Sequence, residues 1–102
     1  MQKLSRANII PVIQQCLTKQ PITKAWLFGS YSRGEERPDS DIDLLVQYDP
    51  NAKVSLMTIS RVMCDLKKAT DKEVDVIEDG RLMPFAVESA NRDKILIYER
   101  AN

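Results

Sequence analysis

A helical pattern between two strand patterns is the feature that most restricts the fold of this chain. Apolar residues recur at helical spacing through residues 55–69, behind Ser55 as a candidate N-cap. The flanking segments 41–48 and 73–77 read as strands. Two strands joined through a helix pair in parallel, because the helix is the crossover that a parallel connection requires. The sequence therefore predicts one mixed sheet that contains both strands.

The rest of the chain predicts a small α/β (α+β) domain. We interpret the apolar stripe of the 55–69 helix as core packing; it consists of Leu56, Ile59, Val62, Met63, Leu66 and Ala69. The remaining elements are expected at about 8–19 (helix), 25–28 (buried strand), 84–93 (helix) and 95–98 (strand). In the first helix, Asn8 is the expected cap and Pro11 falls in the first turn, where proline is tolerated. We expect a single domain over residues 1–102, with a mixed sheet of about four strands and helices packed on it.

Three aspartates are brought toward one part of this predicted sheet. Asp41 and Asp43 are one residue apart in an apolar run, so a strand points both side chains in the same direction. Neighbouring strands lie about 4.8 Å apart, which places Asp75 alongside the pair. Adjacent carboxylates repel one another and resist desolvation, and hard cations such as Mg²⁺ take carboxylate oxygens. The three are therefore candidate metal ligands, whereas Glu73 is more simply a solvated charge; the alternative is a surface strand with turn-capping aspartates.

The turn that follows the 25–28 strand has features of an anion site. Gly29 permits close backbone approach, and Ser30 can cap a short helix whose free amides point at phosphate. Arg33 is the best nearby cation for a phosphate oxygen, although a solvated arginine is the competing interpretation. Ser40 orients either the loop or an aspartate. Without the aspartates, an ordinary strand-to-helix turn would explain this segment equally well.

Composition excludes several chemistries. The chain has no histidine, and its 15 Lys and Arg balance its 15 Asp and Glu, so imidazole catalysis and extended nucleic-acid binding are disfavoured. Cys16 and Cys64 fall inside helical patterns, and we interpret both as buried, unreactive side chains. The N-terminus lacks a long apolar region, and no segment approaches the roughly 20 apolar residues of a membrane span. We expect a soluble, cytoplasmic protein.

The glycine-serine turn at 29–34, the pair Asp41 and Asp43, and the later Asp75 together resemble the signature of the nucleotidyltransferases of the DNA polymerase β superfamily. More narrowly, residues 27–46 with Asp75 downstream are similar to the minimal nucleotidyltransferases, many of which are antitoxins encoded with a HEPN-family toxin. The resemblance implies a polymerase-β-like core in which Asp41 and Asp43 bind Mg²⁺, as two ions, and Asp75 binds metal or activates the attacking hydroxyl. It also implies that Gly29 and Ser30 hold the triphosphate of ATP.

The implied reaction moves AMP from ATP to a hydroxyl of a protein acceptor, a tyrosine of a cognate HEPN toxin, as in type VII-like toxin-antitoxin pairs. The alternative is a non-catalytic antitoxin that neutralises its toxin by binding. Transfer to RNA or to a small molecule is weaker, because the chain has no basic excess and little room for a second domain. The short chain leaves nucleobase preference open and is compatible with a pocket completed in a homo- or hetero-oligomer.

Overall fold

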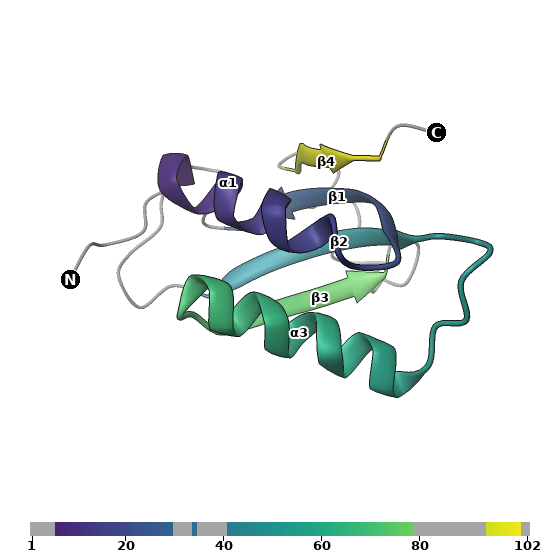
Figure 1. Cartoon of the computed structure of the whole chain (residues 1–102). Helices are drawn as coiled ribbons and strands as arrows, with labels where there is room; N and C mark the ends of the chain where they lie inside the picture. Colours follow the sequence, from purple (N-terminus) through teal and green to yellow (C-terminus); the bar gives the residue numbers. More distant parts are fainter. Residues whose placement is uncertain (1–5, 30–33, 35–40, 79–93, 101–102) are drawn as a thin grey trace.

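The computed structural model describes residues 6–29, 34, 41–78 and 94–100, which form four strands and two helices. In chain order these are α1 (Arg6–Leu17), β1 (Ile22–Phe28), β2 (Ile42–Tyr48), α3 (Leu56–Thr70), β3 (Val74–Glu78) and β4 (Ile95–Glu99) (Figure 1). The helix predicted at 84–93 lies outside the described residues. The expected α+β class with a mixed four-stranded sheet is confirmed.

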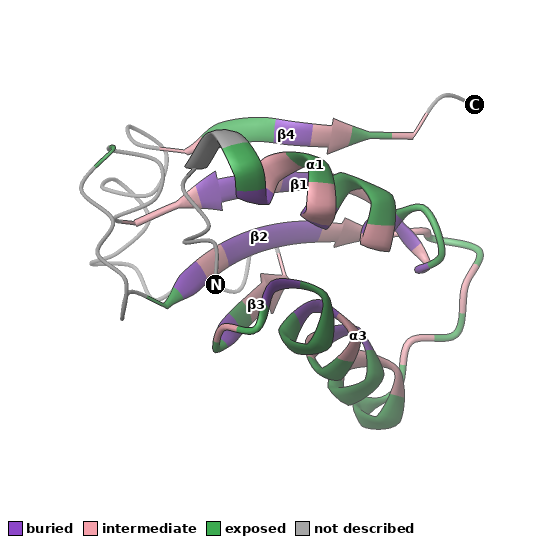
Figure 2. Ribbon diagram, turned by 60° about the vertical axis from the view of Figure 1, so that its left-hand side comes forward, coloured by how far each residue is buried: buried purple, intermediate pink, exposed green. Residues whose placement is uncertain are grey.

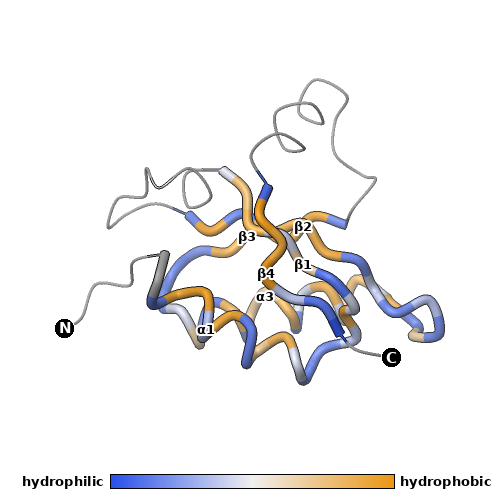
Figure 3. Tube along the Cα trace, turned by 90° about the horizontal axis from the view of Figure 1, so that it is seen from above, coloured by the Kyte–Doolittle hydropathy of each residue, from blue (hydrophilic) through white to orange (hydrophobic). Residues whose placement is uncertain are grey.

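The strands form one sheet in the order β3-β2-β1-β4. β1 pairs antiparallel with β2 and β4, and β2 pairs parallel with β3 through the α3 crossover, as the sequence predicts. Figures 1 and 3 show α1 and α3 on the same side of the sheet. Within the described ranges, both helices therefore cover the same face of the strands. Among the described residues, no helix is long and apolar enough to cross a membrane.

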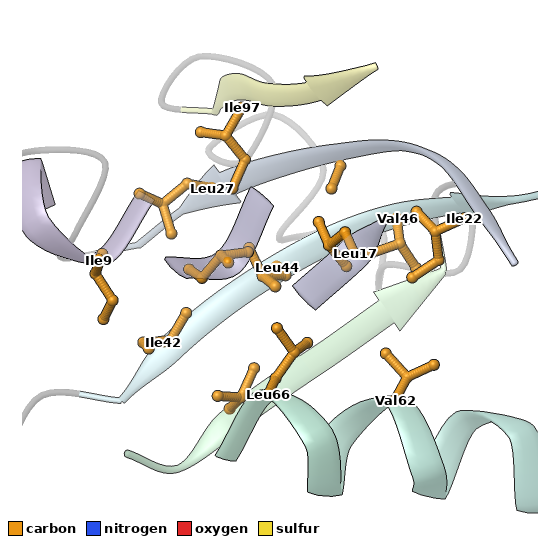
Figure 4. Packing of buried hydrophobic residues seen from close by; sticks show 13 residues of the cluster. Ile9, Leu17, Ile22, Leu27, Ile42, Leu44, Val46, Val62, Leu66 and Ile97 are labelled. Carbon is orange, nitrogen blue, oxygen red and sulfur yellow. The ribbon is translucent and has the colours of Figure 1, made fainter. Parts of the chain in front are cut away.

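The core lies between the two helices and the sheet (Figure 4). Alternate residues of the central strand β2 point toward the helices and are fully buried: Ile42, Leu44 and Val46. They meet side chains one helical turn apart on α1 and α3, which are Ile9, Ile13, Leu17, Val62 and Leu66. Figure 2 shows most of β2 as buried; half-buried Asp43 interrupts this stretch, and Leu45, on the opposite face, is also buried. The core therefore fixes the direction in which the intervening residue Asp43 must point.

The start of α1 differs from the prediction. The helix begins at Arg6, so Asn8 lies inside it and Pro11 is its sixth residue. Proline has no N–H, which removes one intrahelical hydrogen bond. Ile9 and Ile13 flank Pro11 and are completely buried. Their packing stabilises the helix across the missing bond, an effect that local sequence rules do not capture.

Both ends of α3 have clear local causes. The Ser55 backbone N–H donates to Thr58 Oγ1 at 3.2 Å, and the Thr58 backbone N–H donates to Ser55 Oγ at 3.3 Å. This capping box confirms Ser55 as the N-cap. At the other end Asp71 adopts a left-handed conformation, with φ 57°, and its N–H donates to the Lys67 carbonyl at 2.7 Å.

The apolar stripe of α3 is buried over only part of its length, which corrects the core assignment. Val62 and Leu66 are buried, but Leu56 is 85% exposed and Ala69 is also exposed. The 15-residue helix is about 22 Å long, whereas the five-residue strand β3 spans only about 17 Å, so the helix is longer than the strand on which it packs. The cysteine prediction is wrong for Cys64, which is exposed on this helix; Cys16 is half-buried.

Candidate active site

The face of the sheet turned away from the helices carries the candidate site. Along β1, Ala25 and Leu27 are buried toward the helices, while Trp26 and Phe28 are only half-buried. The predicted buried strand is therefore wrong for these two aromatic residues, because the two helices pack on one face of the sheet only. On β2 the same alternation turns Asp43 to the face that Trp26 and Phe28 occupy.

Strand register brings two of the predicted acids together. Asp43 on β2 is the direct partner of Asp75 on the parallel strand β3, and it is also the partner of Phe28 on β1. Neighbouring strands lie about 4.8 Å apart, so the predicted approach of Asp75 to Asp43 is met. Asp41 is exposed and lies one residue before β2. The Ile42 N–H, between the two motif aspartates, donates to the Glu73 carbonyl at 2.9 Å and ties the start of β2 to that of β3.

The acids do not gather into a closed metal cluster. Within the described ranges, no three Asp, Glu or Cys side chains are close enough to hold an ion between them. Carboxylates repel one another, so these side chains come close together only when a cation lies between them. The donor set itself suits Mg²⁺, which takes one or two carboxylates and keeps further positions for water and phosphate oxygens. Metal binding by Asp41, Asp43 and Asp75 stays a prediction.

Gly29 is packed directly against the Asp43 carboxylate. Its φ is +76°, a conformation that favours glycine, and an ideal Cβ on it would lie 2.5 Å from Asp43 Oδ2 and 3.4 Å from Asp43 Cγ. No real side chain fits at 2.5 Å without displacing the carboxylate. The expected close approach to the glycine backbone is thus made by one of the motif aspartates, which couples the turn to the acid pair.

The other predicted phosphate ligands, Ser30, Arg33 and Ser40, lie outside the described residues, and their roles stay predictions. Glu73 is exposed, and its Oε1 is 2.7 Å from Lys67 Nζ, as expected for a solvated charge rather than a further catalytic acid. This hydrogen bond raises the pKa of the Lys67 ammonium group above its ordinary value.

Two aromatic side chains of β1 share the face of the sheet that carries Asp43. Phe28 is the strand partner of Asp43, and the ring of Trp26 is covered by Lys94, whose Nζ is 4.8 Å from the ring centroid. The sequence pattern indicates this shared face. Trp26 and Phe28 alternate with buried neighbours along their strand, as Asp43 does along its own, so all three side chains point away from the helices.

A family comparison agrees with this arrangement. Residues 11–102 match the family described as polymerase beta, nucleotidyltransferase. The chain belongs to this family. It is 34% identical over 91 residues to "Putative protein adenylyltransferase MJ0435" of Methanocaldococcus jannaschii, and the match covers 89% of this chain and 86% of that protein.

Solved structures show the same nucleotidyltransferase fold. One is described as a minimal nucleotidyltransferase; it superposes with a TM-score of 0.75 at 24% identity and covers 93% of this chain and 98% of its own. Another is a complex of an MNT antitoxin with the tri-AMPylated HEPN toxin of Shewanella oneidensis, with a TM-score of 0.60, 20% identity, and coverage of 98% of this chain and 74% of its own. At these identities the likeness is one of fold. The predicted polymerase-β-like core is confirmed, and in this nucleotidyltransferase α1 and α3 lie on the face of the sheet opposite to Asp43 and Asp75.

Proposed function

We propose that this nucleotidyltransferase transfers AMP from ATP to a hydroxyl of a protein acceptor, a tyrosine of a cognate HEPN toxin, and that the reaction depends on Mg²⁺. The observation that carries the proposal is the pairing of Asp43 with Asp75 across β2 and β3, with Gly29 packed on the Asp43 carboxylate. This arrangement places two acids beside the turn proposed to hold phosphate, on the face of the sheet opposite to α1 and α3.

Each residue has a stated part in this reaction. Asp41 and Asp43 hold Mg²⁺, which when bound neutralises phosphate charge and orients the triphosphate. Gly29 and Ser30, assisted by Arg33 and Ser40, hold the triphosphate through backbone and side-chain donors. Asp75 assists metal binding or accepts the proton of the acceptor hydroxyl. The hydroxyl oxygen bonds to the α-phosphorus, the bond from that phosphorus to the bridging oxygen breaks, and pyrophosphate leaves.

The relatives support AMP as the group and protein as the acceptor class. The M. jannaschii relative is named as a protein adenylyltransferase, and an MNT antitoxin of the same fold was solved with an AMPylated HEPN toxin. The balanced charge of this chain is compatible with a protein acceptor rather than a long nucleic acid.

The test is label transfer from ATP labelled at the α-phosphate to the HEPN-family protein encoded beside this chain, with Mg²⁺ present. We expect label on the toxin, an added mass of one or more AMP groups on a tyrosine, and loss of transfer after chelation of the metal. Asp43→Asn should lower transfer at least 100-fold. Glu99→Gln is the matched control, because Glu99 is an exposed carboxylate of the same sheet on the edge strand β4. No transfer by the wild type, or equal transfer by Asp43→Asn, contradicts the proposal.

A second candidate function is neutralisation by binding alone. The observation in its favour is that an MNT antitoxin of the same fold was solved in complex with a HEPN toxin. The two functions differ after the proteins are separated. A toxin that stays inactive and keeps its added AMP supports the enzyme, whereas one that regains activity with unchanged mass supports the binding antitoxin.

A further inference from the structure

A groove between α1 and α3 lies on the side of the sheet opposite to Asp43 and Asp75. Its volume is about 490 Å³, within the range of functional pockets. The colours of Figure 1 show that α1 and α3 run in opposite directions side by side, and the groove lies between their flanks. Small side chains on the two walls, Val12 of α1 and Ala69 of α3, keep the groove open.

The polar groups within the groove already have partners. Gln20 is only 7% exposed, and its Nε2 donates to Asp65 Oδ2 at 2.8 Å. Burial, and secondarily the negative charge of Asp65, raise the pKa of the Cys16 thiol, so the thiol is neutral at physiological pH. The groove therefore presents neither a free thiolate nor a carboxylate without a hydrogen-bond partner.

The rim is basic. Lys19 at the end of α1 and Lys68 on α3 both line the groove and are exposed, and neither makes an ion pair with the described part of the chain. Against these two positive charges the lining has one acid, Asp65. Arg61 is exposed one turn before Asp65 on α3 and extends the basic character along the same helix.

We propose that this groove is a docking site for an acidic amphipathic helix of a protein partner. A helix laid between α1 and α3 can contact the apolar walls at Val12 and Ala69, since helices pack 8–10 Å apart when the contacting side chains are small. Acidic side chains on that helix meet Lys19 and Lys68, which gives charge complementarity at the rim. The inference rests on the proposed function only in the choice of the HEPN-family protein as partner. The groove lies on the opposite side of the sheet from the transfer site, so docking there does not require the transfer reaction.

The test measures binding of the purified HEPN-family protein encoded beside this chain by calorimetry without nucleotide, and maps it by hydrogen exchange. We expect protection of α1 and α3 around Lys19 and Lys68, affinity that falls as salt rises, and at least tenfold weaker binding by the Lys19→Glu, Lys68→Glu double variant. Ala69→Gln narrows the groove without adding charge and should also weaken binding. Lys53→Glu is the matched control, because Lys53 is exposed outside the groove, and its affinity should stay within twofold of wild type.

The outcomes separate this inference from the proposed function. Asp43→Asn should lower transfer at least 100-fold but bind like the wild type. Binding without transfer by the wild type contradicts only the proposed function. Wild-type affinity in the double charge reversal, or protection confined to the β1, β2 and β3 face, overturns the docking site. If inorganic phosphate changes the hydrogen exchange of the groove amides and displaces the partner, the groove is a site for small anions, and the docking proposal is also overturned. No binding at all overturns both proposals.

Discussion

Replacing Gly29 by alanine tests whether the turn positions the Asp43 carboxylate. Two free-energy costs oppose a Cβ at this position: the left-handed backbone conformation, at φ +76°, and the 2.5 Å distance from that Cβ to Asp43 Oδ2. The first costs about 1–2 kcal/mol, partly offset by about 0.4–1 kcal/mol from a less flexible unfolded chain. The second is relieved by rotating Asp43 away from its preferred geometry, which costs about 0.5–1.5 kcal/mol.

Gly34→Ala isolates the first cost. Gly34 has nearly the same φ, +73°, but an added Cβ there meets nothing within 4 Å. Urea denaturation should therefore show Gly29→Ala to be less stable than Gly34→Ala by about 0.5–1.5 kcal/mol, the cost of displacing Asp43 alone. AMP transfer by Gly29→Ala should fall at least 100-fold, far more than its stability loss explains, because the carboxylate that we propose to hold Mg²⁺ has moved.

A double-mutant cycle gives the decisive comparison. Asp43→Ala removes Oδ2 and Cγ, so the stability cost of Gly29→Ala should shrink in that background to the cost of Gly34→Ala. If Gly29→Ala costs the same with and without the Asp43 carboxylate, the glycine does not position that carboxylate, and the argument fails.

Four further outcomes follow from described residues. Ser55→Ala removes the acceptor of the α3 capping box and should lower the free energy of unfolding by about 1 kcal/mol, measured in urea; an unchanged midpoint would contradict the capping role. Asp71→Gly relieves a positive φ of 57° and should raise the melting temperature, with a gain of up to about 1 kcal/mol; a lower melting temperature would show that the aspartate side chain stabilises the turn. Limited alkylation at pH 8 should modify exposed Cys64 before half-buried Cys16, whose pKa is raised, as peptide mass spectrometry can show; faster labelling of Cys16 would refute its burial. The raised pKa of Cys16 in the folded protein favours the neutral thiol. The stability that this thiol contributes is fully present below its unfolded pKa and is lost as pH rises through its folded pKa. Cys16→Ala should therefore lose less stability at alkaline pH than the wild type.

The sequence by itself determined the features that follow local rules. The parallel pairing of β2 and β3 follows from the helix between them, and Ser55 caps α3 through residues three positions apart. The spacing of Asp43 from its apolar neighbours turns it away from the core because strand side chains alternate. These predictions succeed because each depends on a short stretch of chain or on one connection.

Tertiary structure alone decided the features that depend on contacts between distant segments. Burial of Ile9 and Ile13 against the sheet carries α1 through Pro11, and the short β3 strand leaves Leu56 exposed. The approach of Gly29 to Asp43 requires the pairing of β1 with β2, and the groove between α1 and α3 requires the packing of both helices on the sheet. No local pattern specifies which distant side chain fills a given space, because packing is set by the shapes of all the elements that meet there.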